Sequence, residues 1–268
     1  MRKFGIEIEF IGNVSRETMC DRINAEVDGV NIITAGYMDK SNKWRMKTDG
    51  SLDGRYAMEL VTPILQTEDD IAKLKAVIKV MEANGTINSS CGVHCHVDVN
   101  GADSKDIKKL MKFLCKYESA LESLIAPSRR GQSRWCKSIY ETETDLVQTF
   151  NRLNNKTVRN LINNTQYAKF GRYSKWNFKN FWSQGSFENR CHQATLNADK
   201  VEQWVRLNVA LIEASFNFRG QVAHANETTK TFGTKKLLDD LRAKKVISLE
   251  TKKFFMRRYK ELNNEVCR

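Results

Sequence analysis

The first residues that could do chemistry are two glutamates near the start of the chain, Glu7 and Glu9. In residues 3–10, glycine and these two acids alternate with four apolar side chains: Phe4, Ile6, Ile8 and Phe10. The alternation predicts a β-strand with both carboxylates on one face. Such neighbours lie about 6.5–7 Å apart, so both carboxylates can converge on a bound cation. For one Glu-x-Glu strand taken alone, a solvated outer face is the simpler interpretation.

A second group of reactive side chains lies in residues 91–99, which also alternate. His94, His96 and Asp98 share one predicted strand face, whereas three valines and Cys95 share the other. The protein has only four histidines, so two of them in one strand favour a metal-binding or catalytic role over a structural one.

Two more predicted strands carry charged groups at the same spacing. Glu59 lies between Met58 and Leu60 in residues 56–63, and residues 185–197 place Glu188, Arg190 and His192 on one face. Solvent exposure explains the polar face of any one of these predicted strands, but it explains the polar faces of all four together less well.

On one curved antiparallel sheet, the four strands would gather four glutamates, three histidines and one arginine on its concave face. Repulsion between the carboxylates would oppose this arrangement unless bound cations neutralised it. The predicted occupant is therefore a cluster of divalent metals. Oxygen ligands favour Mg²⁺ or Mn²⁺ over Zn²⁺, and nucleotide phosphates often complete Mg²⁺ coordination.

Two polar segments are candidates for contacts with phosphate. Residues 128–137 contain three arginines and Lys137, and guanidinium groups match phosphate oxygens in geometry. Residues 167–187 are rich in aromatic side chains and include Arg172 and Asn177. A solvated basic loop in the first case, and a lid packed over a pocket in the second, are the alternatives.

The elements that must position these side chains predict an α+β fold. Further strands are expected over residues 30–38 and 43–47, and residues 48–54 are a turn by composition. Helices are predicted where apolar residues recur at helical spacing, namely over residues 14–27, 67–84, 103–125, 144–163, 199–218, 234–243 and 248–263. Thr67 and Asp70 have the spacing of a capping box.

Length, charge and cysteine content limit the class of protein. A chain of 268 residues fits one large domain or a domain with an appendage. The net charge is +12, and half of that excess lies in residues 221–268. This positive charge favours binding of phosphates, acidic substrates or nucleic acid, or it only increases solubility. An odd number of cysteines, seven, without a Cys-x-x-Cys pair predicts free thiols. No apolar run reaches eighteen residues, and Glu7 precedes any signal-peptide core, so we expect a cytoplasmic protein without membrane contact.

Five motifs occur in an order that resembles a known family. They are residues 4–10 around the two glutamates, Asp49-Gly-Ser-Leu52 leading to Glu59-Leu-Val-Thr-Pro63, Gly92-Val-His-Cys-His-Val97, Arg134-Trp-Cys136, and Glu188-Asn-Arg190 before Thr195-Leu-Asn197. Together they resemble the amidoligase family of the carboxylate–amine ligase superfamily, which includes glutamine synthetase and glutamate–cysteine ligase. The similarity covers about residues 3–218.

The resemblance implies a curved, mostly antiparallel sheet flanked by helices, like the catalytic domain of glutamine synthetase, and ATP-dependent amide formation through an acyl phosphate. It places ATP and Mg²⁺ or Mn²⁺ on the concave face. The metal ligands would be Glu7, Glu9, Glu59, His94 and Glu188. The catalytic residues would be Arg190, His94, His96 and Arg134. Arg190 and Arg134 would contact the nucleotide phosphate. Lys137, Arg172 and Asn177, from the two polar segments described above, are the further candidates for contact with the nucleotide.

The predicted organisation is a catalytic domain over residues 1–220 and a basic helical appendage over residues 221–268, packed on the same domain. The partners would be a carboxylate and an amine, as small molecules, peptides or protein side chains. This sequence departs from the family pattern at Asn189, where an aromatic or apolar residue is usual, and at Cys95, where an aliphatic residue is usual. Both side chains are expected to point away from the cavity.

Two other classes of function fit part of the pattern. A two-metal phosphodiesterase or nuclease would also use paired metals, histidines and a basic surface. A non-catalytic nucleic-acid-binding protein would use the basic tail and the aromatic segment, but it leaves the acidic strand faces unexplained. Nucleic acid is therefore the less favoured partner.

Overall fold

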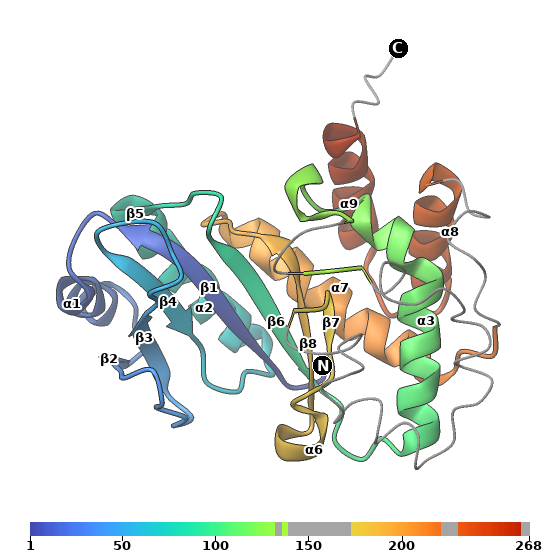
Figure 1. The fold of residues 1–268 in the computed structure, drawn as a ribbon, viewed down its shortest axis with the longest axis horizontal. Coiled ribbons are helices and arrows are strands. Elements are labelled where there is room, and N and C mark those ends of the chain that lie inside the picture. Colours follow the sequence, from blue (N-terminus) through green and yellow to red (C-terminus); the bar gives the residue numbers. More distant parts are fainter. Residues whose placement is uncertain (132–135, 139–172, 221–229, 264–268) are drawn as a thin grey trace. The chain divides into compact units, whose positions relative to one another are not determined.

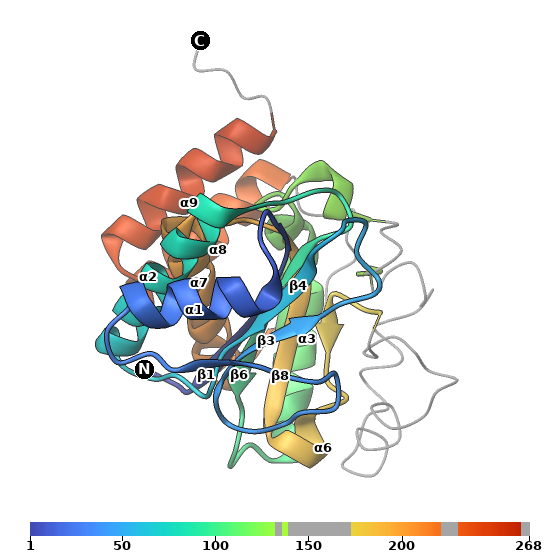
Figure 2. The ribbon, with the colours of Figure 1, turned by 90° about the vertical axis from the view of Figure 1, so that its left-hand side faces the viewer.

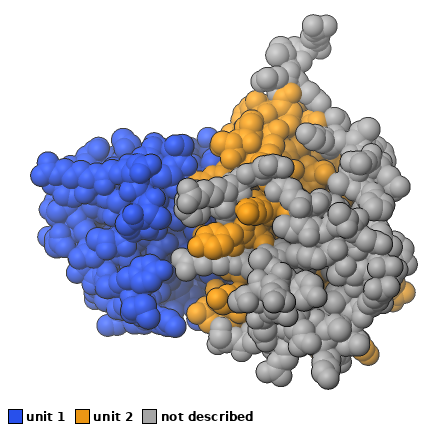
Figure 3. All heavy atoms as spheres, in the orientation of Figure 1, with its two compact units in different colours: residues 1–97, 192–205 blue, residues 98–191, 206–268 orange. Residues whose placement is uncertain are grey.

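The computed structural model describes residues 1–131, 136–138, 173–220 and 230–263. The chain divides into two compact units, residues 1–97 with 192–205 and residues 98–191 with 206–268 (Figure 3). The described residues form an α+β fold with helices flanking a mostly antiparallel, mixed sheet. The predicted fold class is confirmed at this level.

Most strands of the first unit are antiparallel neighbours (Figure 1). In order across the sheet, they are β2 (Ile32–Thr34), β3 (Trp44–Thr48), β4 (Ala57–Val61), β1 (Phe4–Gly12) and β6 (Gly92–Asp98). Only the β2–β3 pair is parallel among these pairings. A short strand, β5 (Gly85–Thr86), pairs with the end of β1. The first strand along the chain is thus an inner strand, with β4 on one side and β6 on the other.

The apolar face of β1 is buried because helices cover it. The side chains of Phe4, Ile6, Ile8 and Phe10 are at most 2% exposed. The helices α1 (Arg16–Glu26) and α2 (Glu68–Asn84) lie beside each other against this face (Figure 2). The predicted capping box begins α2, because Thr67 accepts from the Asp70 backbone and Asp70 accepts from that of Thr67. Glu7 and Glu9 therefore project from the face that these helices leave uncovered.

The second unit is mainly helical. Its described elements include α3 (Ser104–Glu122), the short helix η1 (Pro127–Arg129), β7 (Trp176–Asn177), α6 (Phe181–Gln184), and most of β8 (Ser186–Gln193). The helix α7 (Ala198–Phe216) has residues in both units. The helices α8 (Lys230–Ala243) and α9 (Leu249–Leu262) complete the second unit.

The C-terminal helices join the core of this second unit. The Thr234 hydroxyl in α8 lies 2.7 Å from the Ser123 hydroxyl at the end of α3. The Asn263 amide, after α9, donates to the Ser123 carbonyl over 2.9 Å. Leu238 and Phe255 are buried. The predicted organisation, with residues 221–268 as an appendage to a domain over residues 1–220, stays a prediction.

The predicted helices and strands of the described segments are confirmed, with shifted ends. The strand predicted over 30–38 is only β2, and the chain turns within the predicted range, where the Asp39 backbone donates to the Gly36 carbonyl over 3.0 Å. The helix predicted over 144–163 lies outside the described residues. The six described cysteines are buried free thiols. No helix in the described part of the chain combines the length and apolar character needed to cross a membrane.

Candidate functional site

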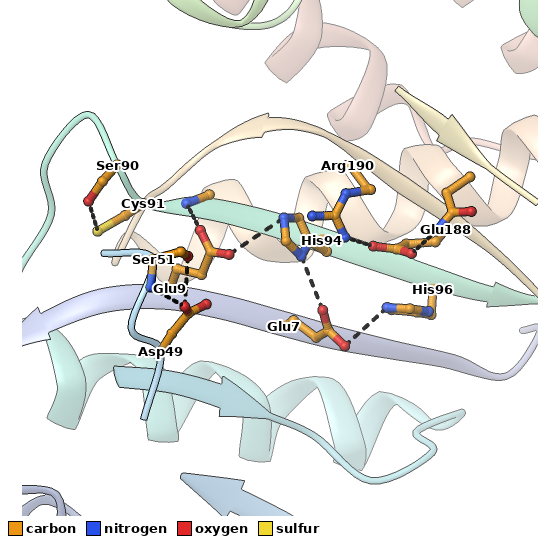
Figure 4. A network of polar contacts seen from close by, with 12 residues as sticks. Glu7, Glu9, Asp49, Ser51, Ser90, Cys91, His94, His96, Glu188 and Arg190 are labelled. Atoms are coloured by element: carbon orange, nitrogen blue, oxygen red, sulfur yellow. Dashed lines mark hydrogen bonds and ion pairs between the residues drawn. The ribbon is translucent and has the colours of Figure 1, made fainter. Parts of the chain in front are cut away.

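Strand pairing brings the acidic and imidazole side chains of the first unit together. Glu7 on β1 lies directly opposite His94 on β6, and Glu9 on β1 lies directly opposite Glu59 on β4. Figure 4 shows the side chains of Glu7, Glu9 and His94 pointing toward one another. Three strands that are distant in sequence therefore supply one polar cluster.

Hydrogen bonds and ion pairs hold this cluster in place. The Glu7 carboxylate lies 3.1 Å from His94 Nδ1 and 3.4 Å from His96 Nε2. The other nitrogen of His94, Nε2, lies 3.8 Å from a Glu9 oxygen. The backbone N–H of Gly92 donates to the second Glu9 oxygen over 2.6 Å, which fixes the orientation of that carboxylate.

One subset of the cluster fits a divalent metal ion. Glu9, Glu59 and His94 each offer one ligand atom, and these atoms lie within 4.8 Å of one another. Two carboxylate oxygens and one imidazole nitrogen are suitable donors for Mg²⁺ or Mn²⁺. Glu9 and His94 are buried and Glu59 is partly buried. Because these groups are largely buried, water stabilises their charge less than it would at the surface, which favours a cation as their partner.

The proton affinities of the acids reflect this crowding. Burial, followed by repulsion from Glu7, Glu9 and Asp49, raises the pKa of Glu59 to about 9. Burial also acts to raise the pKa of Glu7, but the charge of His96 and hydrogen bonds from both histidines outweigh it and hold that pKa well below its usual value. A bound cation would favour the ionised form of Glu59.

We therefore expect the metal-free protein to lose stability as the pH rises from about 5 to about 9. The folded state holds the Glu59 proton up to about pH 9, whereas the unfolded chain releases it near its ordinary pKa of 4.5, so deprotonation favours unfolding across this range. The Glu59→Gln variant should lack this decline between about pH 7 and 9, whereas at lower pH the raised pKa of Glu118, about 7, still contributes to it. Urea unfolding in the presence of EDTA measures both slopes.

The matched control is Glu82→Gln, which removes the carboxylate of an exposed residue on α2 and leaves Glu59 on β4 unchanged. It should retain the wild-type slope. A flat wild-type profile between pH 5 and 9 would show that Glu59 is ionised without a metal.

Asp49 is a site residue that the strand patterns missed. It lies in the turn after β3, where its carboxylate accepts from the backbone and the hydroxyl of Ser51, over 2.8 and 2.7 Å. Its charge contributes to the raised pKa of Glu59, so it faces the same cluster. The glycine and aspartate content of this segment predicted only a turn. The sequence feature that could have identified Asp49 as a site residue is the Asp-Gly-Ser-Leu motif.

In the second unit, β7 and β8 together carry a buried polar group. Asn177 lies opposite Glu188 in the β7–β8 pair. Its side-chain amide donates to one Glu188 oxygen over 2.6 Å, and Arg190 donates to the other. Figure 4 shows Arg190 and Glu188 directed at each other. The carbonyl of the Asn177 side chain accepts from the Lys179 backbone over 2.9 Å. Asn177 thus orients Glu188 here, and its predicted contact with nucleotide stays a prediction, as does the metal-binding role of Glu188.

Asn189, one of the two departures from the family pattern, has a hydrogen-bond partner inside the fold. Asn189 is fully buried and donates over 2.7 Å to the side chain of Asn208 in α7, which is also fully buried. Its oxygen accepts from the Cys191 backbone over 3.0 Å. The other departure, Cys95, is fully buried on the apolar face of β6.

The remaining predicted residues lie in several places. Lys137 is exposed, and its backbone pairs with Tyr173. Arg134 and Arg172 lie outside the described residues, so their predicted roles stay predictions. The ring of His192 lies 4.6 Å, between centroids, from that of Trp204, which is buried.

A buried lysine of the second unit is a feature that no sequence pattern indicated. Lys175 is fully buried, and its ammonium lies 3.0 Å from a Glu122 oxygen. It also donates to the carbonyls of Gly131 and Cys136, over 3.3 and 2.9 Å. Beside it, burial raises the pKa of Glu118 to about 7, although Ser138 and Lys175 oppose the rise.

Comparison with known families agrees with the motif order. A family model described as a putative amidoligase enzyme matches residues 1–212 of the 268. This match includes β1, β4, β6 and β8, which carry the charged side chains described above. No curated protein matches the chain.

Proposed function

The chain belongs to the putative amidoligase family, and from this premise we propose that it is an ATP- and Mg²⁺-dependent ligase that joins a carboxylate to an amine. The family supports ligase-type activity in general. The nucleotide, the metal and the acyl-phosphate route are part of the proposal.

The observation that carries this proposal is the convergence of Glu9, Glu59 and His94 from three strands. Their ligand atoms lie within 4.8 Å of one another, and burial together with repulsion from the neighbouring acids raises the pKa of Glu59, although the charge of Lys47 opposes the rise. Acids buried so close together are unfavourable unless a cation joins them. A ligase that binds ATP requires such a cation to offset the negative charge of the triphosphate.

Amide formation needs an activated acid because a carboxylate is a poor electrophile. In the proposed reaction, a carboxylate oxygen of the substrate attacks the γ-phosphorus of ATP, and ADP leaves. The amine then attacks the acyl carbon, the C–O bond to phosphate breaks, and the amine loses a proton. When held by Glu9, Glu59 and His94, Mg²⁺ would supply positive charge that stabilises the transferring phosphoryl group.

The residues of the chain would have separate roles in this reaction. Glu9, Glu59 and His94 would hold one metal, and Glu7, which already contacts both histidines, would fix their orientation and contribute a further oxygen ligand. Arg190 would stabilise the transferring phosphoryl group, and Glu188 would hold the guanidinium for that task. His96, beside Glu7, would assist at metal or phosphate.

The test is ADP release in the presence of Mg²⁺, ATP and mixed pools of acids and amines. We expect release that requires both an acid and an amine. Glu7→Gln and Arg190→Ala should each lower it by about a hundredfold or more, since each removes charge stabilisation in the transition state. Thermal unfolding of the variants serves as the check on folding.

Two results would overturn the proposal. One is ADP release that is independent of the amine, or that survives both substitutions. The other is metal-dependent cleavage of DNA or RNA without ATP, which would assign the metal cluster to a phosphodiesterase.

A further inference from the structure

The strand β3 places two cations on the same sheet face as the acidic cluster. Trp44 and Met46 of this strand are buried in the core, so Arg45 and Lys47 point to the opposite face. Lys47 lies directly opposite Glu59, which in turn lies opposite Glu9. Acids and cations thus form one row across three neighbouring strands.

Arg45 is a buried cation with unused hydrogen-bonding capacity. Its residue is 8% exposed. One terminal nitrogen donates to the Asp39 carbonyl, and the Asp39 carboxylate lies 3.7 Å from the same nitrogen. Its Nε is buried and has no hydrogen-bond partner among the described residues. Such a donor is unfavourable until an acceptor reaches it, and a ligand oxygen is an acceptor.

Lys47 is the more accessible of the two cations. It is partly exposed, and its ammonium donates over 3.2 Å to the Tyr37 carbonyl. Asp39, whose carboxylate also accepts from the Ser41 backbone, lies beside Arg45, whereas Lys47 faces Glu59. A metal bound by Glu59 would offset the charge of that carboxylate, so the charge of Lys47 would remain for a ligand. The same loop exposes Tyr37 and Met38, which are 64% and 76% exposed. An anion with an apolar part would suit these surroundings.

We propose that Arg45 and Lys47 bind a second acidic group on the acid substrate, so that the substrate is a dicarboxylic acid or a compound with two such groups. This inference rests on the proposed ligase function, which puts the reacting carboxylate near Glu9, Glu59 and His94. Strands in a sheet are about 4.8 Å apart, so β3 lies roughly 5–10 Å from that position. This span matches carboxylates separated by three to five carbons.

Calorimetric titration without ATP tests the subsite independently of turnover. The probes are glutarate and adipate, with valerate as a monocarboxylate of the length of glutarate, in the presence of Mg²⁺. We expect one or both dicarboxylates to bind at least about tenfold more tightly than valerate, because a charge-assisted hydrogen bond contributes about that factor. Lys47→Met should remove this preference. Lys40→Met, at an exposed lysine of the adjoining loop, should retain it.

Equal binding of valerate and the dicarboxylates, no binding of either dicarboxylate, or unchanged binding by Lys47→Met would overturn the subsite. These failures differ from a failure of the ligase reaction. If ADP release requires acid and amine but shows no preference for dicarboxylates, the subsite is wrong and the ligase stands. If dicarboxylates bind through Lys47 but ADP release ignores the amine, the reaction is wrong and the subsite stands.

Discussion

Replacing Glu9 by glutamine should weaken Mn²⁺ binding by about a hundredfold or more. Glu9 is the central acid of the metal group, with Glu59 opposite it on β4 and His94 3.8 Å away on β6. Loss of a residue that only supports a metal ligand costs about 10–100-fold in affinity, so loss of a direct ligand should cost at least as much. Electron paramagnetic resonance of free Mn²⁺ measures the affinity.

The Glu9→Gln variant should keep its fold, because the glutamine oxygen can still accept the hydrogen bond from the Gly92 backbone. Glu26→Gln, at an exposed position on α1, removes the same charge elsewhere and should bind Mn²⁺ like the wild type. Wild-type affinity in Glu9→Gln would place the metal away from this cluster.

Lys175→Met should destabilise the protein by about 3–5 kcal/mol, the usual cost of removing one partner from a buried ion pair. The substitution leaves the Glu122 carboxylate without its cation, with the Gly131 backbone as a remaining donor, and it removes the Lys175 donor from two backbone carbonyls. Urea unfolding measures the change in the free energy of unfolding.

Two further variants separate this effect from a general cost of losing a lysine. Lys179→Met, at an exposed position four residues away, should change stability by no more than about 0.5 kcal/mol. Adding Glu122→Gln to Lys175→Met should recover part of the loss, because it removes the buried charge that the first substitution leaves unpaired. A double variant that loses the sum of the two single effects would contradict this ion-pair account.

The alternation of side chains predicted the faces of β1 and β6 but not the partners across them. Spacing of two residues places Glu7 and Glu9 together on any strand. That Glu7 meets His94 while Glu9 meets Glu59 depends on which strands pair and in which alignment, and these pairings join residues at least fifty positions apart. Local sequence carries little information about such distant pairing.

Buried charges were the second limit of prediction from sequence. Lys175 and Arg45 read as ordinary basic residues in basic segments, yet both are buried. Lys175 meets carbonyl oxygens and an acid from distant segments, and Arg45 meets the carbonyl and carboxylate of Asp39 in the preceding loop. Asp49 was likewise assigned to a turn on composition alone. Its effect on the proton affinity of Glu59 depends on the packing of its loop beside β4.

The buried pair of Asn189 and Asn208 has a consequence for how β8 is assembled. If this strand docked one residue out of step, each amide would lie in an apolar interior with nothing to bond, at a cost of about 1–3 kcal/mol for every group left unsatisfied. An aliphatic pair would tolerate the misalignment far better. The hydrogen bond between the two asparagines therefore favours the native register of β8 over shifted registers. In that register, the glutamate and arginine on either side of Asn189 have a single orientation.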